Sequence, residues 1–261
     1  MVGDGLAVDS TGNIFIPSGF GDPTVWKIAS DGALTEFASG YQSAVGIAID
    51  SQDNLFVNDY RGNALTMITP AGVKTDFATQ LNGPAGVAID SQGNIYVTLF
   101  GANFSGTGAS IIRFTPEGVQ SPFASGAPLR DIIGIAIDDA DNVYVSNWVS
   151  GNLYKISAGT TTPVLFATIP DSANINQITY SKGYIYVPTP NEDKIYRVDL
   201  AGNIELLAGV GTRGLKNGPA LESTFGGPNS AGANAAGDTL YVVDATLNNL
   251  RAIDLGCPTP G

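Results

Sequence analysis

Apolar residues alternate with small or polar residues in a short segment that recurs along the chain. In residues 86–97, GVAIDSQGNIYV, the apolar Val87 and Ile89 flank the small Ala88, and the same alternation resumes in NIYV. Between them, residues 90–94 are rich in Asp, Asn and Gly, which favour tight turns. A period of two on both sides of a turn predicts a β-hairpin, and the small residue suits a crowded inner strand.

The same hairpin begins at Gly5, Gly46, Gly86 and Gly134, and two degenerate copies begin near residues 176 and 230. A third apolar strand follows every copy, and a fourth follows the first five. This spacing is close to the roughly 40–50-residue period of propeller blades, and no stretch has a sustained helical period. The pattern predicts an all-β, six-bladed β-propeller of four-stranded antiparallel blades over residues 1–256, with a C-terminal tail at 257–261.

The last copy is shorter than the others, because no fourth strand follows its third strand at residues 250–255. Either the natural chain extends upstream of Met1 and supplies that strand, or the last blade keeps three strands. An unpaired edge strand can pair with another chain. If the last blade keeps three strands, self-association through its edge is one hypothesis.

The recurring Gly-x-Ala-x-Asp, Gly-Asn and Tyr-Val positions resemble NHL repeats and the wider superfamily of six-bladed propellers. Residues 208–228, AGVGTRGLKNGPALESTFGGP, also resemble the long segment between blades of many NHL proteins. The resemblance covers nearly the whole chain and implies the propeller fold. It does not select a function, because lyases, lactonases and binding scaffolds all use this fold.

Composition excludes several function classes. The 261 residues include 24 acidic and 12 basic residues, no histidine and a single cysteine, Cys257, so the net charge is −12. A negative surface repels phosphate backbones, which excludes nucleic acid as a partner. Without histidine there is no Ser-His-Asp triad, and propeller lyases that rely on histidine are disfavoured. No apolar run reaches the ~18 residues of a membrane span, so we expect no membrane insertion. We expect a secreted, periplasmic or cell-surface protein whose signal peptide is absent from this chain.

The residue before each repeat is the first place to look for a binding site, because propeller ligands bind where the innermost strands begin. The first four copies place Asp4, Val45, Ala85 and Ile133 there. The alternation of apolar residues in the two degenerate copies places Asn176 and Asn229 at the same level. When the ring closes, Asp4, Asn176 and Asn229 become neighbours, and their oxygen atoms suit a hard cation such as Ca²⁺.

A second resemblance concerns these polar residues. Residues 226–255 resemble the Pro-Asn-Gly blade of the gluconolactonase and senescence-marker-protein (regucalcin) family, and residues 4–15 resemble its Asp-Gly-Leu blade. The resemblance implies that Asn229 and Asp4 bind a divalent metal, that Asp4 is also a general base, and that Asn176 lies near the metal or substrate. The chain departs from the family at Ala85, where a metal-binding Glu is expected, and at Ser230, which replaces Gly. The alternative is that these polar residues cap strand ends or hold channel water.

Aromatic and basic residues are expected in the loops at the same end of the channel: Tyr41, Tyr60, Phe100, Phe104, Trp148, Arg61, Arg130 and Arg213. Aromatic rings with a few charged groups around a depression suit a sugar, a peptide or a small amphipathic ligand. The leading hypothesis is a module that binds a protein, glycan or small-molecule ligand on this face. The alternative is a Ca²⁺-assisted lactonase or esterase, so the sequence leaves open whether the protein is an enzyme. Calcium is the one cofactor that the sequence suggests.

Overall fold

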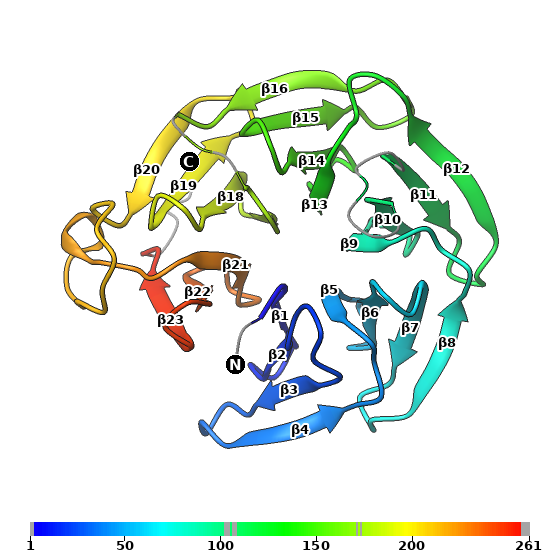
Figure 1. Cartoon of the computed structure of the whole chain (residues 1–261), viewed down its shortest axis with the longest axis horizontal. Helices are drawn as coiled ribbons and strands as arrows, with labels where there is room; N and C mark the ends of the chain where they lie inside the picture. Colours follow the sequence, from blue (N-terminus) through cyan, green and yellow to red (C-terminus); the bar gives the residue numbers. More distant parts are fainter. Residues whose placement is uncertain (1–2, 102–104, 106–108, 171, 173, 257–261) are drawn as a thin grey trace.

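Six antiparallel sheets stand around a common axis, each with its first strand innermost and its last strand on the outside (Figure 1). The structure, a computed structural model, describes residues 3–101, 105, 109–170, 172 and 174–256. Within these residues the predicted all-β, six-bladed propeller is confirmed, because five sheets have four strands and the sixth has three.

The strands follow one another from the inside of each blade to the outside. The first blade contains β1 (Ala7–Val8), β2 (Ile14–Pro17), β3 (Val25–Ile28) and β4 (Leu34–Ala38). The second contains β5 (Ala44–Ile49), β6 (Leu55–Asp59), β7 (Ala64–Ile68) and β8 (Lys74–Ala78). The third contains β9 (Pro84–Ile89), β10 (Ile95–Leu99), β11 (Ser110–Phe114) and β12 (Gln120–Ser125).

The fourth blade contains β13 (Ile132–Ile137), β14 (Val143–Asn147), β15 (Asn152–Ile156) and β16 (Val164–Thr168). The fifth contains β17 (Thr179–Ser181), β18 (Tyr184–Thr189), β19 (Lys194–Asp199) and β20 (Ile204–Ala208). The sixth contains β21 (Pro228–Ala233), β22 (Thr239–Asp244) and β23 (Asn249–Asp254), and a short 3₁₀ helix, η2 (Ala220–Glu222), precedes it.

Strand register is the same in all six blades, which confirms the alignment of the degenerate copies. Ala88 pairs with Tyr96 in the third blade, and Thr179 pairs with Tyr186 in the fifth. Gly232 pairs with Tyr241 in the sixth. Counting back three residues from each of these inner positions reaches Ala85, Asn176 and Asn229. The residues predicted to form a ring at the channel mouth therefore occupy equivalent positions.

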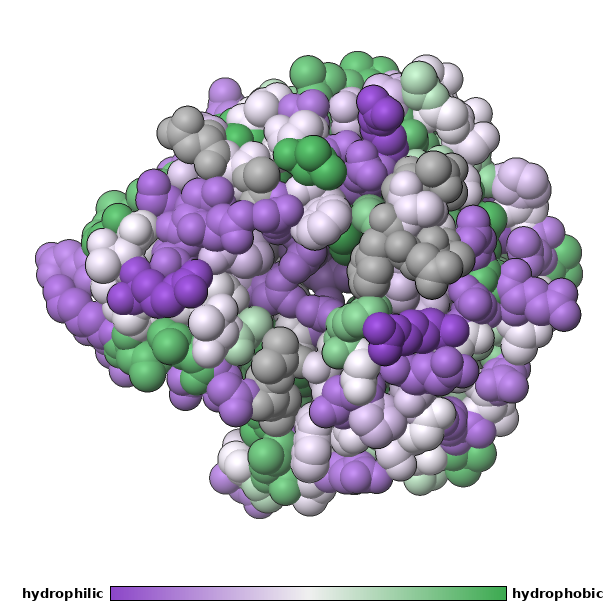
Figure 2. All heavy atoms as spheres, in the orientation of Figure 1, coloured by the Kyte–Doolittle hydropathy of each residue, from purple (hydrophilic) through white to green (hydrophobic). Residues whose placement is uncertain are grey.

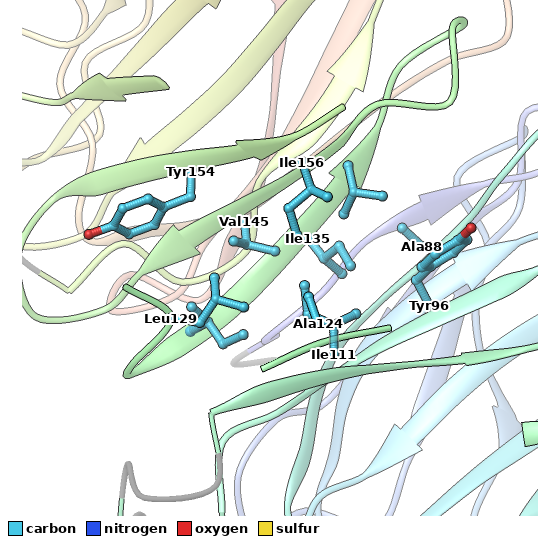
Figure 3. Packing of buried hydrophobic residues seen from close by; sticks show 11 residues of the cluster. Ala88, Tyr96, Ile111, Ala124, Leu129, Ile135, Val145, Tyr154 and Ile156 are labelled. Carbon is cyan, nitrogen blue, oxygen red and sulfur yellow. The ribbon is translucent and has the colours of Figure 1, made fainter. Parts of the chain in front are cut away.

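The core consists of apolar layers between neighbouring blades. Between the third and fourth blades, Ile111, Ile135 and Val145 pack together with Ala88 and Tyr96 at the edge of the cluster (Figure 3). Small residues on the innermost strands leave room for the blades to converge on the axis. Since one blade cannot bury both of its faces, the repeat is stable only as a closed ring.

In the first four blades, the hairpin turn between the first and second strands is held by an Asp and an Asn. The Asp9 carboxylate accepts hydrogen bonds from the backbone N–H groups of Thr11 (2.9 Å) and Asn13 (2.8 Å) and from the side chain of Asn13 (2.6 Å). Asp50, Asp90 and Asp138 accept equivalent bonds. Burial raises the pKa of Asp9, but these hydrogen bonds outweigh it and leave the pKa below its ordinary value. These recurring carboxylates are therefore turn residues.

Candidate functional site

A cavity of about 180 Å³ lies at one end of the central channel, between the starts of the innermost strands and the loops that join second to third strands. The molecular surface is hollowed at the centre of the ring on this face (Figure 2). The residues that line the cavity are Asp4, Phe20, Val45, Tyr60, Ala85, Phe100, Ile133, Trp148, Asn176 and Gln177. Polar side chains occupy one side and apolar side chains the other.

The three polar residues predicted to be neighbours form a chain of hydrogen bonds at the polar side. The Asn176 side-chain amide donates to Asn229 Oδ1. The Asn229 amide donates in turn to Asp4 Oδ1 at 2.6 Å and to the backbone oxygen of Gly3 at 3.0 Å. The backbone N–H of Phe20 donates to Asp4 Oδ2 at 3.1 Å. The structure therefore brings Asp4, Asn176 and Asn229 together and fixes their orientation.

Asp4 is the acidic residue of the cavity. Burial raises the pKa of its carboxyl above the ordinary value, and this effect exceeds the lowering by the hydrogen bonds from Asn229 and Phe20. None of the ion pairs among the described residues involves Asp4. A negative charge on Asp4 is thus stabilised by hydrogen bonds but not by a cationic side chain.

A divalent metal does not fit this arrangement well. Asn229 Oδ1 already accepts a hydrogen bond from Asn176, and the Asn229 amide nitrogen points toward Asp4. A cation bound here would meet one carboxylate, and the Asn229 amide would have to rotate to offer its oxygen atom. No group of three or more acidic, Cys or His residues that suits a metal occurs in the described part of the chain. Calcium affinity depends on the number of charged ligands, so one carboxylate makes a weak site.

The apolar side of the cavity is built from packed aromatic rings. Tyr60 and Phe100 are buried, and the Tyr60 hydroxyl donates to the backbone oxygen of Gly101 at 2.7 Å. The Phe100 and Trp148 rings meet edge to face with centroids 5.8 Å apart. At the rim, the guanidinium of Arg61 lies 3.9 Å from the centroid of the Phe20 ring. Packing fixes these rings before any ligand arrives, which lowers the entropic cost of binding.

Three residues predicted for this face do not line the cavity. Tyr41 is buried between the first two blades, where its hydroxyl bonds to Thr66 Oγ1 at 2.8 Å, and burial raises its pKa to about 12. Arg130 is exposed but does not line the cavity. Arg213 pairs with Asp193 at 3.4 Å in the segment between the fifth and sixth blades. Phe104 and Cys257 lie outside the described residues.

Two cavity residues, Phe20 and Gln177, were not among the predicted ones. Phe20 follows the second strand of its blade, as Tyr60, Phe100 and Trp148 follow theirs, so the repeat itself contained the signal. The signal is hidden because the loop is longer here. Tyr60 directly follows the last residue of β6, whereas two residues lie between the end of β2 and Phe20. Gln177 replaces the Gly of the repeat in the fifth blade.

Comparison with models of protein families identifies the family of this chain. Residues 95–249 match the family described as a repeat of unknown function (DUF6923), and this match spans more than half of the chain. The chain belongs to this family. A search of curated protein sequences finds no match.

Solved structures with the same fold come from proteins with different functions. A gluconolactonase from Xanthomonas campestris superposes with a TM-score of 0.78 at 17% identity, covering 97% of this chain and 85% of that one. An auxiliary nutrient-binding protein from Bacteroides thetaiotaomicron gives 0.80 at 13% identity, covering 96% and 68%. A chain of a nidogen/laminin complex gives 0.74 at 17% identity, covering 94% and 90%. At these identities the comparison establishes the six-bladed fold, which is used by binding proteins and by lactonases.

The described residues contain no helix with the length and apolar character of a membrane span.

Proposed function

We propose that this protein is a binding module that takes a small, partly apolar ligand in the cavity at the channel mouth. The observation that carries the proposal is the composition of the cavity wall, which sets Asp4 and Asn176 opposite Tyr60, Phe100 and Trp148. Ligand sites combine such an apolar wall with a few oriented polar groups. The location expected from the sequence, outside the cytoplasm, belongs to the same proposal.

The size of the cavity limits the ligand. Pockets for drug-sized molecules span roughly 300–1,000 Å³, whereas this cavity is about 180 Å³. We therefore propose a ligand of about one ring with a short polar substituent. A glycan or protein partner would have to bind across the loops and insert only one such group.

Ligand-observed NMR with single-ring fragments of each charge tests this function. The decisive variant is Ala85→Leu, which fills the cavity from its apolar wall. The matched control is Ala233→Leu, the same change at the opposite end of the channel, where Ala233 lines a separate cavity. We expect fragments to bind the wild type and the control and to be excluded from Ala85→Leu. Fragments that bind none of the three, or all three equally, would refute the proposal.

The second candidate function is a Ca²⁺-assisted lactonase or esterase. The juxtaposition of Asp4, Asn176 and Asn229 supports it, because these are the residues that the gluconolactonase resemblance implies. Calorimetric titration of the chelator-treated protein with Ca²⁺, repeated on Asp4→Ala, tests it. Stoichiometric binding that is lost in the variant would favour the enzyme and justify a screen of lactones and esters. Absence of binding at millimolar Ca²⁺ would rule out the Ca²⁺-assisted enzyme and leave the binding module as the one proposed function.

A further inference from the structure

The hydrogen-bond inventory of the cavity narrows the class of ligand. Both amide protons of Asn229 are used, one on Asp4 and one on Gly3, and its oxygen accepts from Asn176. Among the described residues, each Asp4 oxygen accepts one hydrogen bond, although an ionised carboxylate offers about four acceptor positions. Asp4 therefore has unused acceptor positions, and a ligand can fill them by donating N–H or O–H groups.

The charges of Asp4 and of the whole protein favour a cationic ligand. Asp4 has no ion-pair partner among the described residues, and the guanidinium of Arg61 is stacked on Phe20. An anionic ligand would be repelled by Asp4 and by a protein whose net charge is −12. A cationic ligand would be attracted by both, and a charge-assisted hydrogen bond to a carboxylate is roughly twice as strong as a neutral one.

The aromatic wall of the cavity also favours binding of an organic cation. The faces of aromatic rings attract cations through their quadrupoles, and the attraction is stronger where water is excluded. Phe20, Tyr60, Phe100 and Trp148 all line the space into which Asp4 faces. Their rings also pack against an apolar body, which an inorganic cation lacks.

We propose that the ligand is a small organic ammonium compound, with its nitrogen at Asp4 and its apolar body against the rings of Tyr60, Phe100 and Trp148. The inference rests on the proposed function, since it names the ligand class of the same cavity. It differs from the metal hypothesis in requiring a single carboxylate, N–H donors on the ligand and an apolar wall.

The test compares three probes that differ in charge but share one ring: 2-phenylethylammonium, 2-phenylethanol and phenylacetate. Their affinities are measured by calorimetry at neutral pH for the wild type and for Asp4→Asn, which removes the charge and keeps the size of the side chain. We expect the wild type to prefer the ammonium over the alcohol by about tenfold, to bind phenylacetate least, and to lose this preference in the variant. Ethylammonium, which has no ring, should bind more weakly than 2-phenylethylammonium.

The outcomes separate this inference from the proposed function. Equal affinities of the wild type for ammonium and alcohol, both abolished by Ala85→Leu, would overturn the ammonium assignment and keep the cavity as a binding site. Failure of all the probes to bind the wild type would overturn both. The comparison of the three probes on the wild type tests the ammonium assignment even where Asp4→Asn folds poorly.

Discussion

Asp4 shows how one residue links the stability of this protein to its function. Its carboxyl belongs to a half-buried residue beside the cavity, where its charge is costly to the free protein and would attract the cationic ligand that we propose. Residues placed in this way commonly lower stability for the sake of binding. The pH dependence of folding therefore reports on this site.

The first prediction concerns Asp4→Asn. Because burial raises the pKa of Asp4 in the folded state, its favourable contribution is fully present below its ordinary pKa and is lost as pH rises through the raised value. The variant lacks this dependence. Urea denaturation at pH 7 and pH 4.5 should show the free energy of unfolding of Asp4→Asn improving, relative to the wild type, at the higher pH. An unchanged difference at the two pH values would contradict the raised pKa.

Side chains at one repeated position of the second strands differ in their hydrogen bonding. In β10, Thr98 Oγ1 accepts from the backbone N–H of Gly86 at 2.7 Å and donates to the backbone oxygen of Ile133 at 2.6 Å. Asn58 occupies the equivalent position in β6 and is also buried, but neither of its polar side-chain atoms has a hydrogen-bond partner in the described structure. The same substitution should therefore have opposite effects in the two blades.

Thr98→Val should lower the free energy of unfolding by about 1–3 kcal/mol, because it leaves the buried N–H of Gly86 and the part-buried carbonyl of Ile133 without this partner. Asn58→Val should be neutral or stabilising, because it removes two polar atoms that gain nothing from burial. Chemical denaturation of both variants measures this contrast. A large loss in Asn58→Val would show that ordered water satisfies this amide and would contradict the prediction.

At the level of the elements, neighbouring blades are joined by contacts between hairpin turns. The Ser10 hydroxyl of the first blade donates to Asp53 of the second at 2.6 Å, and Ser91 of the third donates to Asp141 of the fourth at 2.7 Å. The equivalent Ser51 faces the third blade, where Gly93 replaces the aspartate. Asp53 and Asp141 adopt the left-handed backbone conformation that Gly93 also adopts, with φ of 60°, 60° and 81°.

Ser10→Ala should therefore cost about 0.5–1 kcal/mol, the usual contribution of one hydrogen bond. Ser51→Ala is the matched control and should have a smaller effect, because no aspartate faces it. Thermal unfolding of the two variants compares them directly. Equal losses would mean that the bond between the first two blades adds nothing to stability.

The elements were predictable from the sequence because each blade repeats one alternation of apolar and small residues. That alternation also set the register of the fifth and sixth blades, and hence the neighbourhood of Asp4, Asn176 and Asn229. The aromatic wall was only partly predictable. The sequence shows which loops carry rings, but burial of Tyr41 against Thr66 and exposure of Phe20 depend on loop paths that no period encodes.

At the scale of the whole molecule, the ring is uneven, because the sixth blade has three strands in the described part of the chain and the other five have four. The outer side of β23 borders a groove of about 580 Å³, which Leu250, Ala252 and Ile253 share with the segment around Pro219. In the other five blades a fourth strand covers the equivalent strand. An uncovered strand favours pairing with a second copy of the chain.

We therefore expect self-association that increases with protein concentration and that Ala252→Lys weakens, because a charge on an edge strand disfavours pairing. Thr35→Lys places the same charge on β4, the outer strand of a complete blade, and should change nothing. Sedimentation velocity over a range of concentrations distinguishes the variants. A monomer at every concentration would show that this edge does not pair with a second copy.

The central claim is that the channel mouth binds a small organic ligand, and the fluorescence of Trp148 tests it most directly. The chain has two tryptophans, Trp26 and Trp148, and only Trp148 is among the residues that line the cavity. In a Trp26→Phe background, the emission of Trp148 is recorded during titration with 2-phenylethylammonium. The account predicts a saturable change that Ala85→Leu abolishes. Emission that stays constant, or that changes equally in Ala85→Leu, would contradict it.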